Sequence, residues 1–433
     1  MRNNDNILGR LPEDWDVVPI GKLYDFTKKP KEILYSNYDQ LPFIAMDLIP
    51  IDILYLDKFK LKKSTEISSG TYIEDGDILL AKITPCFENG KQCIVTGLPN
   101  GFGIASTEII PIKEKAGTSS KYFLYYYLLK SDVRKLIAGK MEGATGRQRV
   151  PVHLIKQLFI PFPLLSEQQK IAAVLFKIQK AIEIQESIIE KTRVLKKSTL
   201  HHVFTHGLRG ERLKETEIGP MPESWDLIKI GECCDVRSST ISFNELNRGR
   251  SKNNDVLCHA IKVSDMNLPG NEKYIFAANI EVELSSKLVY EKAIPANSVI
   301  FPKRGAAIAT NKKRLTTLWS LLDPNLIAII PRARITSEFL YYWFLTFDLA
   351  SIQDLGPTPQ LNKKDVEPIS IPFPSDREQL EIVKILRAID HKIDHHTAKK
   401  SALQDLFKTM LNKLMTGAIR VKDLDIDVSE VSA

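Results

Sequence analysis

Apolar side chains recur every three or four positions along two long stretches, residues 166–207 and 375–417. This spacing is typical of one face of an α-helix. The apolar positions expected to form helix–helix contacts are Ile171, Leu175, Ile178, Ile182, Leu195, Ile382, Leu386, Ile389, Ile393 and Leu406. A glycine ends each stretch, Gly207 or Gly417, where a C-terminal cap is expected. The pattern predicts two helices of roughly 40 residues, or about 60 Å at 1.5 Å per residue.

The same four residues, Ile-Pro-Phe-Pro, precede both stretches, beginning at Ile160 and at Ile371. Ser166 with Gln169, and Ser375 with Glu378, then have the spacing of a capping box. In that motif the hydroxyl accepts a hydrogen bond from the N3 amide, and the N3 side chain reaches back to the amide of the cap residue. Both helices are therefore expected to begin at these serines.

The two halves of the chain are copies of each other. Ile160 and Ile371 are 211 residues apart, and at that offset Ile171 meets Ile382. The openings also match, since "LPEDWDVVPIGKL" from Leu11 resembles "MPESWDLIKIGEC" from Met221. A repeat of this length is much longer than a solenoid unit, so each copy is a domain followed by a helix.

A long helix with a narrow apolar stripe needs a partner along its length. We predict that the two helices pair antiparallel as a coiled coil about a pseudo-twofold axis, with polar interruptions at Gln185, His396 and Thr397. The alternative is that each helix packs only on its own domain. The predicted segments are a first domain at 1–165, a helix at 166–207, a second domain at 215–374, a helix at 375–417 and a tail at 418–433.

Each globular segment mixes short apolar runs typical of strands with an aromatic helical run, which predicts an α+β fold. The runs typical of strands are "DGDILLAKI", "NSVIFPK" and "NLIAIIP". The aromatic run "YFLYYYLL" from Tyr122 could stack on bases. Its rings are consecutive, without the interleaved basic and polar residues of a stacking platform, so a core helix is favoured.

Composition narrows the class of protein. The chain of 433 residues has no run of about 18 apolar residues and no signal peptide, so we expect a cytoplasmic protein without a membrane span. Its five cysteines show no Cys-x-x-Cys spacing, which argues for reduced thiols. The net charge of +7 permits a polyanionic partner.

No catalytic motif is evident. The stretch "ENGKQ" around Lys91 lacks the first glycine and the Ser/Thr of a phosphate loop. The Asp/Asn-Pro-Pro-Tyr/Phe tetrad of amino-methyltransferases is absent. The histidines at 201, 202 and 206, and those at 391, 395 and 396, lack a further metal ligand of the His-Glu-x-x-His type. We expect a non-catalytic chain without a metal or cofactor.

Polar and basic loops carry the candidate chemistry. Arg, Asn and Gln can read base edges, whereas Lys and Thr more often hold phosphates. The alternative is that these loops are merely solvated surface. The residues expected to bind DNA are Lys82, Thr84, Asn89, Lys91, Arg147, Gln148, Arg149, Lys303, Arg304, Asn311, Lys312, Lys313, Arg314, Thr358 and Gln360.

Taken together, the sequence resembles the specificity subunit of type I DNA restriction and modification systems. The resemblance rests on the repeated "IPFP…EQ" entries into long helices, on the "PEDWDVVPIGKL" and "PESWDLIKIG" openings and on "LLAKITPCFENGK", and it covers nearly the whole chain. It implies two target-recognition domains, each reading one half of a split DNA sequence, with two antiparallel helices as a ruler between them.

The resemblance also implies partners: double-stranded DNA, two methyltransferase subunits that carry S-adenosylmethionine, and restriction subunits. The outward helix positions Gln168, Lys177, Glu183 and Lys191 are candidates for docking the methyltransferase.

Two rival hypotheses are a stand-alone DNA-binding protein or regulator, and a scaffold that joins two protein-binding domains. A third hypothesis is an enzyme whose titratable residues are far apart in the sequence and come together only in the folded structure.

Overall fold

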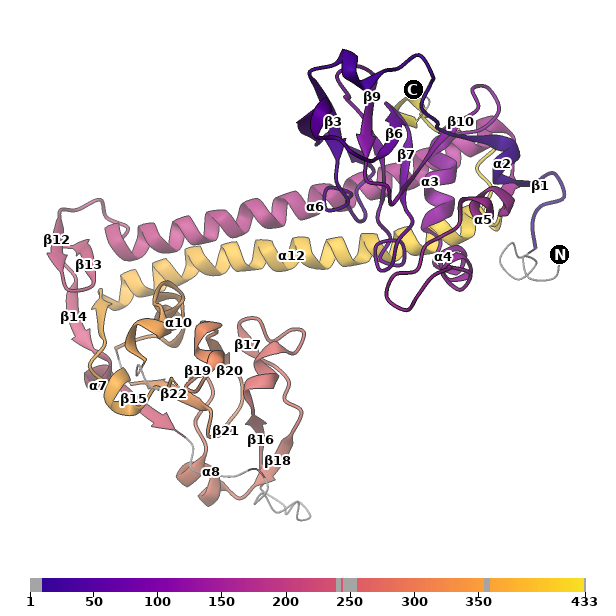
Figure 1. Ribbon diagram of the computed structural model, residues 1–433. Helices are drawn as coiled ribbons and strands as arrows, with labels where there is room; N and C mark the ends of the chain where they lie inside the picture. Colours follow the sequence, from indigo (N-terminus) through magenta and orange to yellow (C-terminus); the bar gives the residue numbers. More distant parts are fainter. Residues whose placement is uncertain (1–9, 239–242, 244–254, 333, 354–358, 432–433) are drawn as a thin grey trace. The chain divides into compact units, whose positions relative to one another are not determined.

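The computed structural model describes residues 10–238, 243, 255–332, 334–353 and 359–431 (Figure 1). The chain forms two compact units. The first comprises Met1–Ile188 with His396–Ala433, and the second comprises Ile189–His395. Each unit therefore contains one globular domain and a part of each long helix.

The first unit is built on two sheets. One has five strands in the order β2 (Tyr24–Phe26), β10 (Ile109–Glu114), β7 (Ile78–Ala81), β8 (Gln92–Val95) and β4 (Tyr55–Leu56). The other has the order β5 (Lys60–Lys63), β3 (Gln40–Ile44), β9 (Phe102–Ala105) and β6 (Thr71–Glu74). Strand β1 (Asp16–Pro19) pairs with β11 (Phe159–Phe162). The helices are α2 (Ile20–Leu23), α3 (Lys121–Leu129), α4 (Ser131–Ala138) and α5 (Val152–Gln157).

The second unit repeats this plan. Its five-stranded sheet has the order β15 (Cys234–Ser238), β22 (Leu326–Pro331), β19 (Val299–Pro302), β20 (Arg314–Thr316) and β17 (Tyr274–Ile275). A three-stranded sheet orders β18 (Glu281–Leu284), β16 (Val256–Ile261) and β21 (Ser320–Leu322), and β14 (Asp226–Lys229) pairs with β23 (Ser370–Phe373). A hairpin joins β12 (Leu213–Thr216) to β13 (Gly219–Pro222). The helices are α7 (Ile230–Cys233), α8 (Ser286–Lys292), α9 (Ala306–Ala309), α10 (Ser337–Thr346) and α11 (Lys363–Val366).

The matching sheet orders confirm the α+β tandem repeat. The predicted strand runs form β7, β19 and β22, whose residues are mostly buried. The aromatic runs form α3 and α10, whose rings lie in the two main cores. Tyr125 and Tyr126, for example, are 0% exposed, which agrees with a core helix and not with a stacking platform.

The two long helices are α6 (Leu165–His206) and α12 (Asp376–Met415), and within each unit they run side by side (Figure 1). In the first unit Gln185 Oε1 lies 2.7 Å from His396 Nδ1, and Gln179 and Ile182 line the same cavity as Gln404 and Phe407. In the second unit Lys196 Nζ lies 2.6 Å from Asp390. Residue numbers that rise along α6 therefore meet numbers that fall along α12, which is the predicted antiparallel pairing.

Burial along the helices corrects part of the predicted seam. Ile171, Leu175, Ile382 and Leu386 are fully buried. Ile178, Ile182, Ile389 and Ile393 are half-buried. Leu195 and Leu406 are 52% and 45% exposed, so the prediction is wrong for these two. Near Leu195 the polar residues Thr192 and Lys196 face inward instead, and adjacent helical residues point about 100° apart.

The repeated entry motif works through its Glu-Gln pair. Glu167 Oε2 accepts a hydrogen bond from Trp15 Nε1 at 3.2 Å, and Glu378 Oε2 accepts one from Trp225 Nε1 at 3.1 Å. The predicted capping boxes are therefore wrong in detail. α6 begins at Leu165, before Ser166, and although Ser375 Oγ accepts from the Glu378 amide at 3.4 Å, the Glu378 carboxylate bonds to Trp225 instead of reaching back.

The glutamines of this pair join each long helix to the aromatic helix of its domain. Gln168 Oε1 accepts from the Ser120 amide at 3.1 Å, and Gln379 Oε1 accepts from the Thr336 amide at 3.0 Å. Ser120 and Thr336 are the N-cap residues of α3 and α10. Gln168 is 0% exposed, so its expected place on the outward, partner-docking face is wrong.

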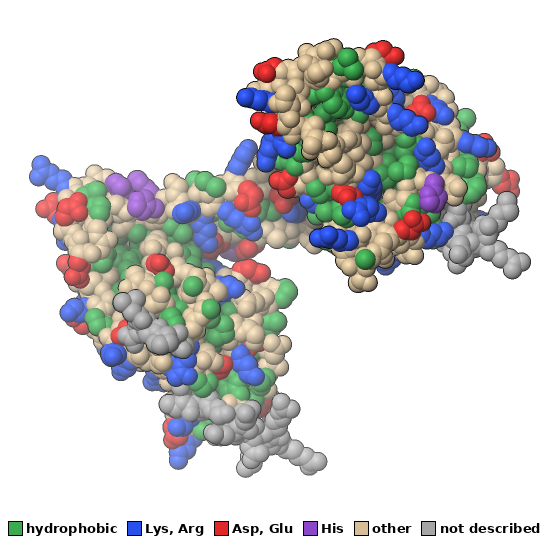
Figure 2. Space-filling view, viewed as in Figure 1, with side chains coloured by type: hydrophobic (Ala, Val, Ile, Leu, Met, Phe, Trp, Pro, Cys, Tyr) green, Lys and Arg blue, Asp and Glu red, His purple; other side chains and the backbone are tan. Residues whose placement is uncertain are grey.

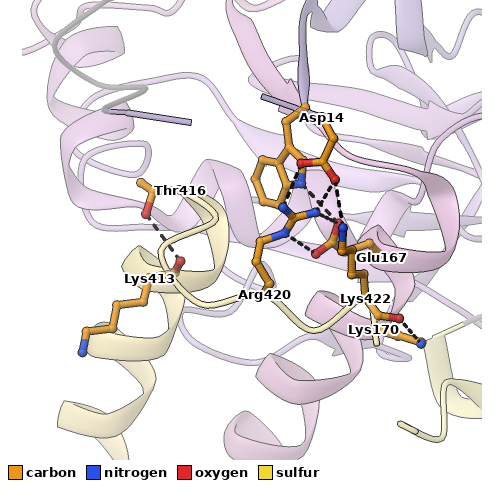
Figure 3. Close-up of polar contacts among 8 residues, drawn as sticks. Asp14, Glu167, Lys170, Lys413, Thr416, Arg420 and Lys422 are labelled. Carbon is orange, nitrogen blue, oxygen red and sulfur yellow. Dashed lines mark hydrogen bonds and ion pairs between the residues drawn. The ribbon is translucent and has the colours of Figure 1, made fainter. Parts of the chain in front are cut away.

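The C-terminal segment is part of the first unit and not a separate tail. Val421 and Val431 are 2% exposed and belong to its core. Arg420 donates to both oxygens of Glu167 at 2.9 Å and to Asp14 at 2.8 and 2.7 Å (Figure 3). Gly417, at φ +68°, ends α12 as predicted and turns the chain toward this cluster.

Acid should loosen this attachment. The hydrogen bond from Arg420 lowers the pKa of Asp14 from its usual 3.8 to about 2. A carboxylate with a lowered pKa stabilises the folded state above its unfolded value, and this contribution is lost as the pH falls from about 4 to 2. Hydrogen exchange should show that protection of the amides of 421–431 decreases over this range. The Arg420→Gln variant should be weakly protected there already at pH 7. Equal protection of both proteins at pH 7 would show that the cluster does not hold the segment.

Candidate nucleic-acid interface

Two of the predicted loops of the first unit meet. The loop after β7 pairs with the segment before α5 through a bridge between Ile83 and Arg149. The Thr84 amide donates to the Gln148 carbonyl at 3.0 Å, and the Val150 amide donates to the Lys82 carbonyl at 2.8 Å. Backbone bonds therefore place the predicted residues 82–84 beside 147–149.

The second unit brings together the corresponding segments. Arg304, after β19, forms a bridge with Gln360. The Gly305 amide donates to the Pro359 carbonyl at 2.8 Å, and the Leu361 amide donates to the Lys303 carbonyl at 2.9 Å. Each unit thus presents a paired surface made by the loop after the central strand and the segment that precedes the last short helix.

The side chains of the first surface differ in their exposure and in their hydrogen bonds within the unit. Arg147 and Asn89 are exposed, and Gln148 is half-buried. Arg149 is held by Glu108, with Nε and Nη2 2.7–3.0 Å from the carboxylate oxygens, and this bond lowers the pKa of Glu108. Lys82 is half-buried. Thr84 Oγ1 donates to Glu88 at 2.9 Å, and Lys91 Nζ donates to the Met46 carbonyl at 2.9 Å, so both contribute to loop shape.

On the second surface Arg304 is exposed and directed to solvent. Gln360 Nε2 donates to Asn362 at 2.8 Å, and Lys312 Nζ donates to Asn267. Thr358 lies outside the described residues. The two surfaces therefore share a backbone plan but present different side chains.

Four residues predicted to bind DNA are buried or bonded within the unit. Lys303 and Lys313 are 8% and 1% exposed. Lys313 Nζ donates to Asn311 Oδ1 at 2.6 Å and to the Phe347 carbonyl at 2.7 Å, and burial lowers its pKa to about 8. Arg314 donates to the carbonyls of Lys313 and Met266, and Asn311 also accepts from the Leu349 amide at 3.0 Å.

These side chains are held inside the unit because the stretch that carries them folds into regular secondary structure. The basic residues from Lys303 to Arg314 were expected to lie in a loop, yet this stretch contains α9 and the start of β20. Asn311, at φ +51°, forms the tight turn between them, and Lys313 ties that turn to the end of α10. A run of cations in sequence does not show which side chains point inward.

One basic element was missed by the sequence reading. The edge strand β5 and its approach carry the exposed lysines 58, 60 and 63, with Lys62 Nζ 3.9 Å from the centre of the Phe43 ring. Lysines on an edge strand prevent sheet-to-sheet aggregation, and they can also hold phosphates. The alternating run "KFKLKK" was the available signal. Figure 2 shows Lys and Arg side chains spread over the visible face of the first unit.

The histidine groups do not form a metal centre among the described residues, where no cluster of three His, Cys, Asp or Glu side chains could hold an ion. His201, His202 and His206 are exposed near the end of α6 (Figure 2), and His202 stacks on His206 with 4.9 Å between ring centres. No described helix is long and apolar enough to cross a bilayer.

Known proteins share this organisation. The putative type I restriction enzyme MjaX specificity subunit of Methanocaldococcus jannaschii is 24% identical over 436 residues, which cover 96% of each chain. A solved chain from a study of complex assembly and conformational transition of the type I R-M system has a TM-score of 0.59 and 18% identity, covering 95% of this chain and 100% of that one. The S subunit of a type I restriction-modification system from M. genitalium has a TM-score of 0.55 and 18% identity, covering 94% and 98%.

The two structures support the fold, and the sequence match supports the family. The family described as "Type I restriction modification DNA specificity domain" matches residues 12–192 and again residues 222–405. These two ranges include both globular domains and most of both long helices. The chain therefore belongs to the type I restriction-modification DNA specificity family, with two copies of its domain.

Proposed function

We infer that this chain is the DNA-recognition subunit that directs a type I restriction-modification complex to its target. The observation that carries this inference is that the two units share one backbone arrangement but expose different side chains in the paired loops. The equivalent bridges show this difference, since Arg149 stands where Gln360 stands in the other unit, and Ile83 stands where Arg304 stands. Two reading surfaces that differ in side chains match a target with two different halves.

We propose that the domain at 1–165 reads one half-site and the domain at 215–374 reads the other. The helices at 166–207 and 375–417 would set the gap between the half-sites, and residues 418–433 would complete the first unit. A helix of about 60 Å is on the scale of one to two DNA turns of about 34–36 Å.

The catalytic activities of the complex would reside on its partner subunits. We propose that two methyltransferase subunits, which bind S-adenosylmethionine, and the restriction subunits assemble with this chain on double-stranded DNA in the cytoplasm. This chain would act without a cofactor or a catalytic site of its own. A stand-alone regulator would instead bind its full target tightly without any partner.

Single substitutions on the two surfaces test the assignment. Arg147→Ala should weaken binding only to DNA with an intact first half-site, and Arg304→Ala only to DNA with an intact second half-site. Loss of a base contact is worth about 1–3 kcal/mol, or about 5- to 150-fold in affinity. The measurement is a set of binding titrations of the assembled complex with DNA mutated in either half.

The control for both variants is Lys197→Ala, an exposed lysine of α6 outside the paired loops. It should leave both half-site preferences unchanged. A uniform loss at every sequence for Arg147→Ala and Arg304→Ala would assign these arginines to phosphates. No loss for either variant would remove the paired loops from the interface.

A further inference from the structure

The two units attach their domains to the long helices at one equivalent place. Strands β4 and β17 are the last strands of their five-stranded sheets, and both pair in parallel with the neighbouring strand. Each begins with a tyrosine. Tyr55 Oη lies 3.0 Å from Tyr122 Oη, and Tyr274 Oη donates to Glu338, which is the residue at the matching position of α10.

In the first unit the C-terminal segment of the chain covers this place. Tyr55 Oη donates to the Glu430 carbonyl at 3.4 Å, and Lys180 Nζ lies 2.7 Å from the Glu430 carboxylate. Val431 is 2% exposed and packs into the core that includes Phe176. The space between β4 and α6 is therefore a groove that accepts a segment of the chain, the 3₁₀ turn Ser429–Val431.

The second unit has a cavity of about 570 Å³ at the equivalent position. Its lining includes Glu272, Tyr274, Phe276, Arg387, His391 and Asp394. His391 is the counterpart of Lys180, since the two are 211 residues apart, and Tyr274 is the counterpart of Tyr55. No segment among the described residues takes the place that Glu430 and Val431 have in the first unit.

The charges of the cavity identify what fits there. Its two strong cations are already paired: Lys273 Nζ lies 2.9 Å from Glu338 and 3.4 Å from Asp390, and Arg387 contacts Glu338. The carboxylates of Glu272 and Asp394 remain on the lining, and burial, with the nearby Asp390 carboxylate, raises the pKa of Asp394. The Phe276 ring is 66% exposed beside them.

We propose that this cavity is a docking site for a short segment of a protein partner that carries both basic and aliphatic side chains. The basic side chains would meet Glu272 and Asp394, and the aliphatic ones would cover Phe276. The acidic segment "DLDIDVSEV" from Asp423, which binds the equivalent groove of the first unit, has the wrong charge for this site. The proposal does not depend on DNA recognition.

Photo-cross-linking on the purified full chain tests the site. Phe276 is replaced by the photoreactive amino acid p-benzoylphenylalanine, and the probes are two labelled peptides, Val-Lys-Ile-Lys-Val-Lys-Ile and its charge-inverted form with Glu for Lys. The basic peptide should label position 276 and the acidic one should not. Introducing Glu272→Gln and Asp394→Asn together should reduce the labelling about fivefold, because two exposed charge pairs are lost and each changes the affinity by about twofold.

The matched control places the same photoreactive group at Tyr290, which is 71% exposed on α8 and outside this cavity. Labelling there should stay at background. Equal labelling of positions 276 and 290, labelling by both peptides, or labelling that is insensitive to the two charge removals would overturn the proposal. Thermal unfolding of each variant confirms that it remains folded.

Discussion

Replacing Glu378 by alanine should lower the midpoint of thermal unfolding of the second unit by about 6–12 °C. Glu378 is 4% exposed, and its carboxylate accepts from Trp225 Nε1 at 3.1 Å and from the Leu208 amide at 3.1 Å. It thus joins the start of α12, the segment after α6 and the opening of the second domain. Without it, the buried Trp225 Nε1–H and the partly buried Leu208 amide lose their acceptor, which costs about 3 kcal/mol at this kind of site.

A neighbouring glutamate provides the control for this experiment. Glu381 pairs with Arg377 at 3.1 Å and with Arg209 on the surface. Because exposed ion pairs contribute about 0–1 kcal/mol, Glu381→Ala should shift the midpoint by less than about 3 °C. Calorimetry of the full chain measures both variants. Similar shifts for the two would show that the Glu-Trp contact does not determine the stability of the junction.

Lengthening both long helices should widen the gap in the DNA target and leave both half-sites unchanged. Seven residues inserted after Gln185 and seven after His396 add about 10 Å of helix, or about three base pairs at 3.4 Å each. These two residues are equivalent positions of the repeat and contact each other, so the pairing on either side keeps its register. Affinity should decrease, because three base pairs rotate one half-site by about 100° relative to the other.

The matched control is the same insertion in α6 alone. It shifts the register of one helix against the other and breaks contacts such as the one between Lys196 and Asp390. This variant should lose binding to targets of every gap length. Selection from a library of DNA with variable gaps gives the preferred spacing. An unchanged gap in the double-insertion variant would rule out a ruler role for the helices.

The repeat and the helices could be predicted because their signals are long. Apolar residues at helical spacing persist over about ten turns, and a tandem copy confirms each one. The antiparallel pairing followed from the length of the helices. The roles of Glu167 and Gln168 were not predicted, since a Glu-Gln pair after a serine is read locally as a cap, whereas its partners Trp15 and Ser120 are far away in sequence.

The candidate interface could be predicted only in part. The loops that contain Arg147 and Arg304 were found from charge and turn residues, but Lys303 and Lys313 were placed on the same surface. A lysine that satisfies a carbonyl inside a domain looks the same in sequence as one that faces solvent. Leu195 and Leu406 illustrate the opposite error. An apolar residue at helical spacing can remain exposed, as Leu195 does beside Lys196, which pairs with Asp390 of the partner helix.

The most direct measurement is a genome-wide map of adenine methylation in cells that carry the partner methyltransferase, with and without this chain. We predict that one motif with two different halves and a fixed gap is methylated only when the chain is present. Exchanging the loop residues of one unit should then change one half of that motif. A continuous or symmetric motif, or methylation that is identical without the chain while the methyltransferase is active, would contradict a bipartite reading by two unlike domains.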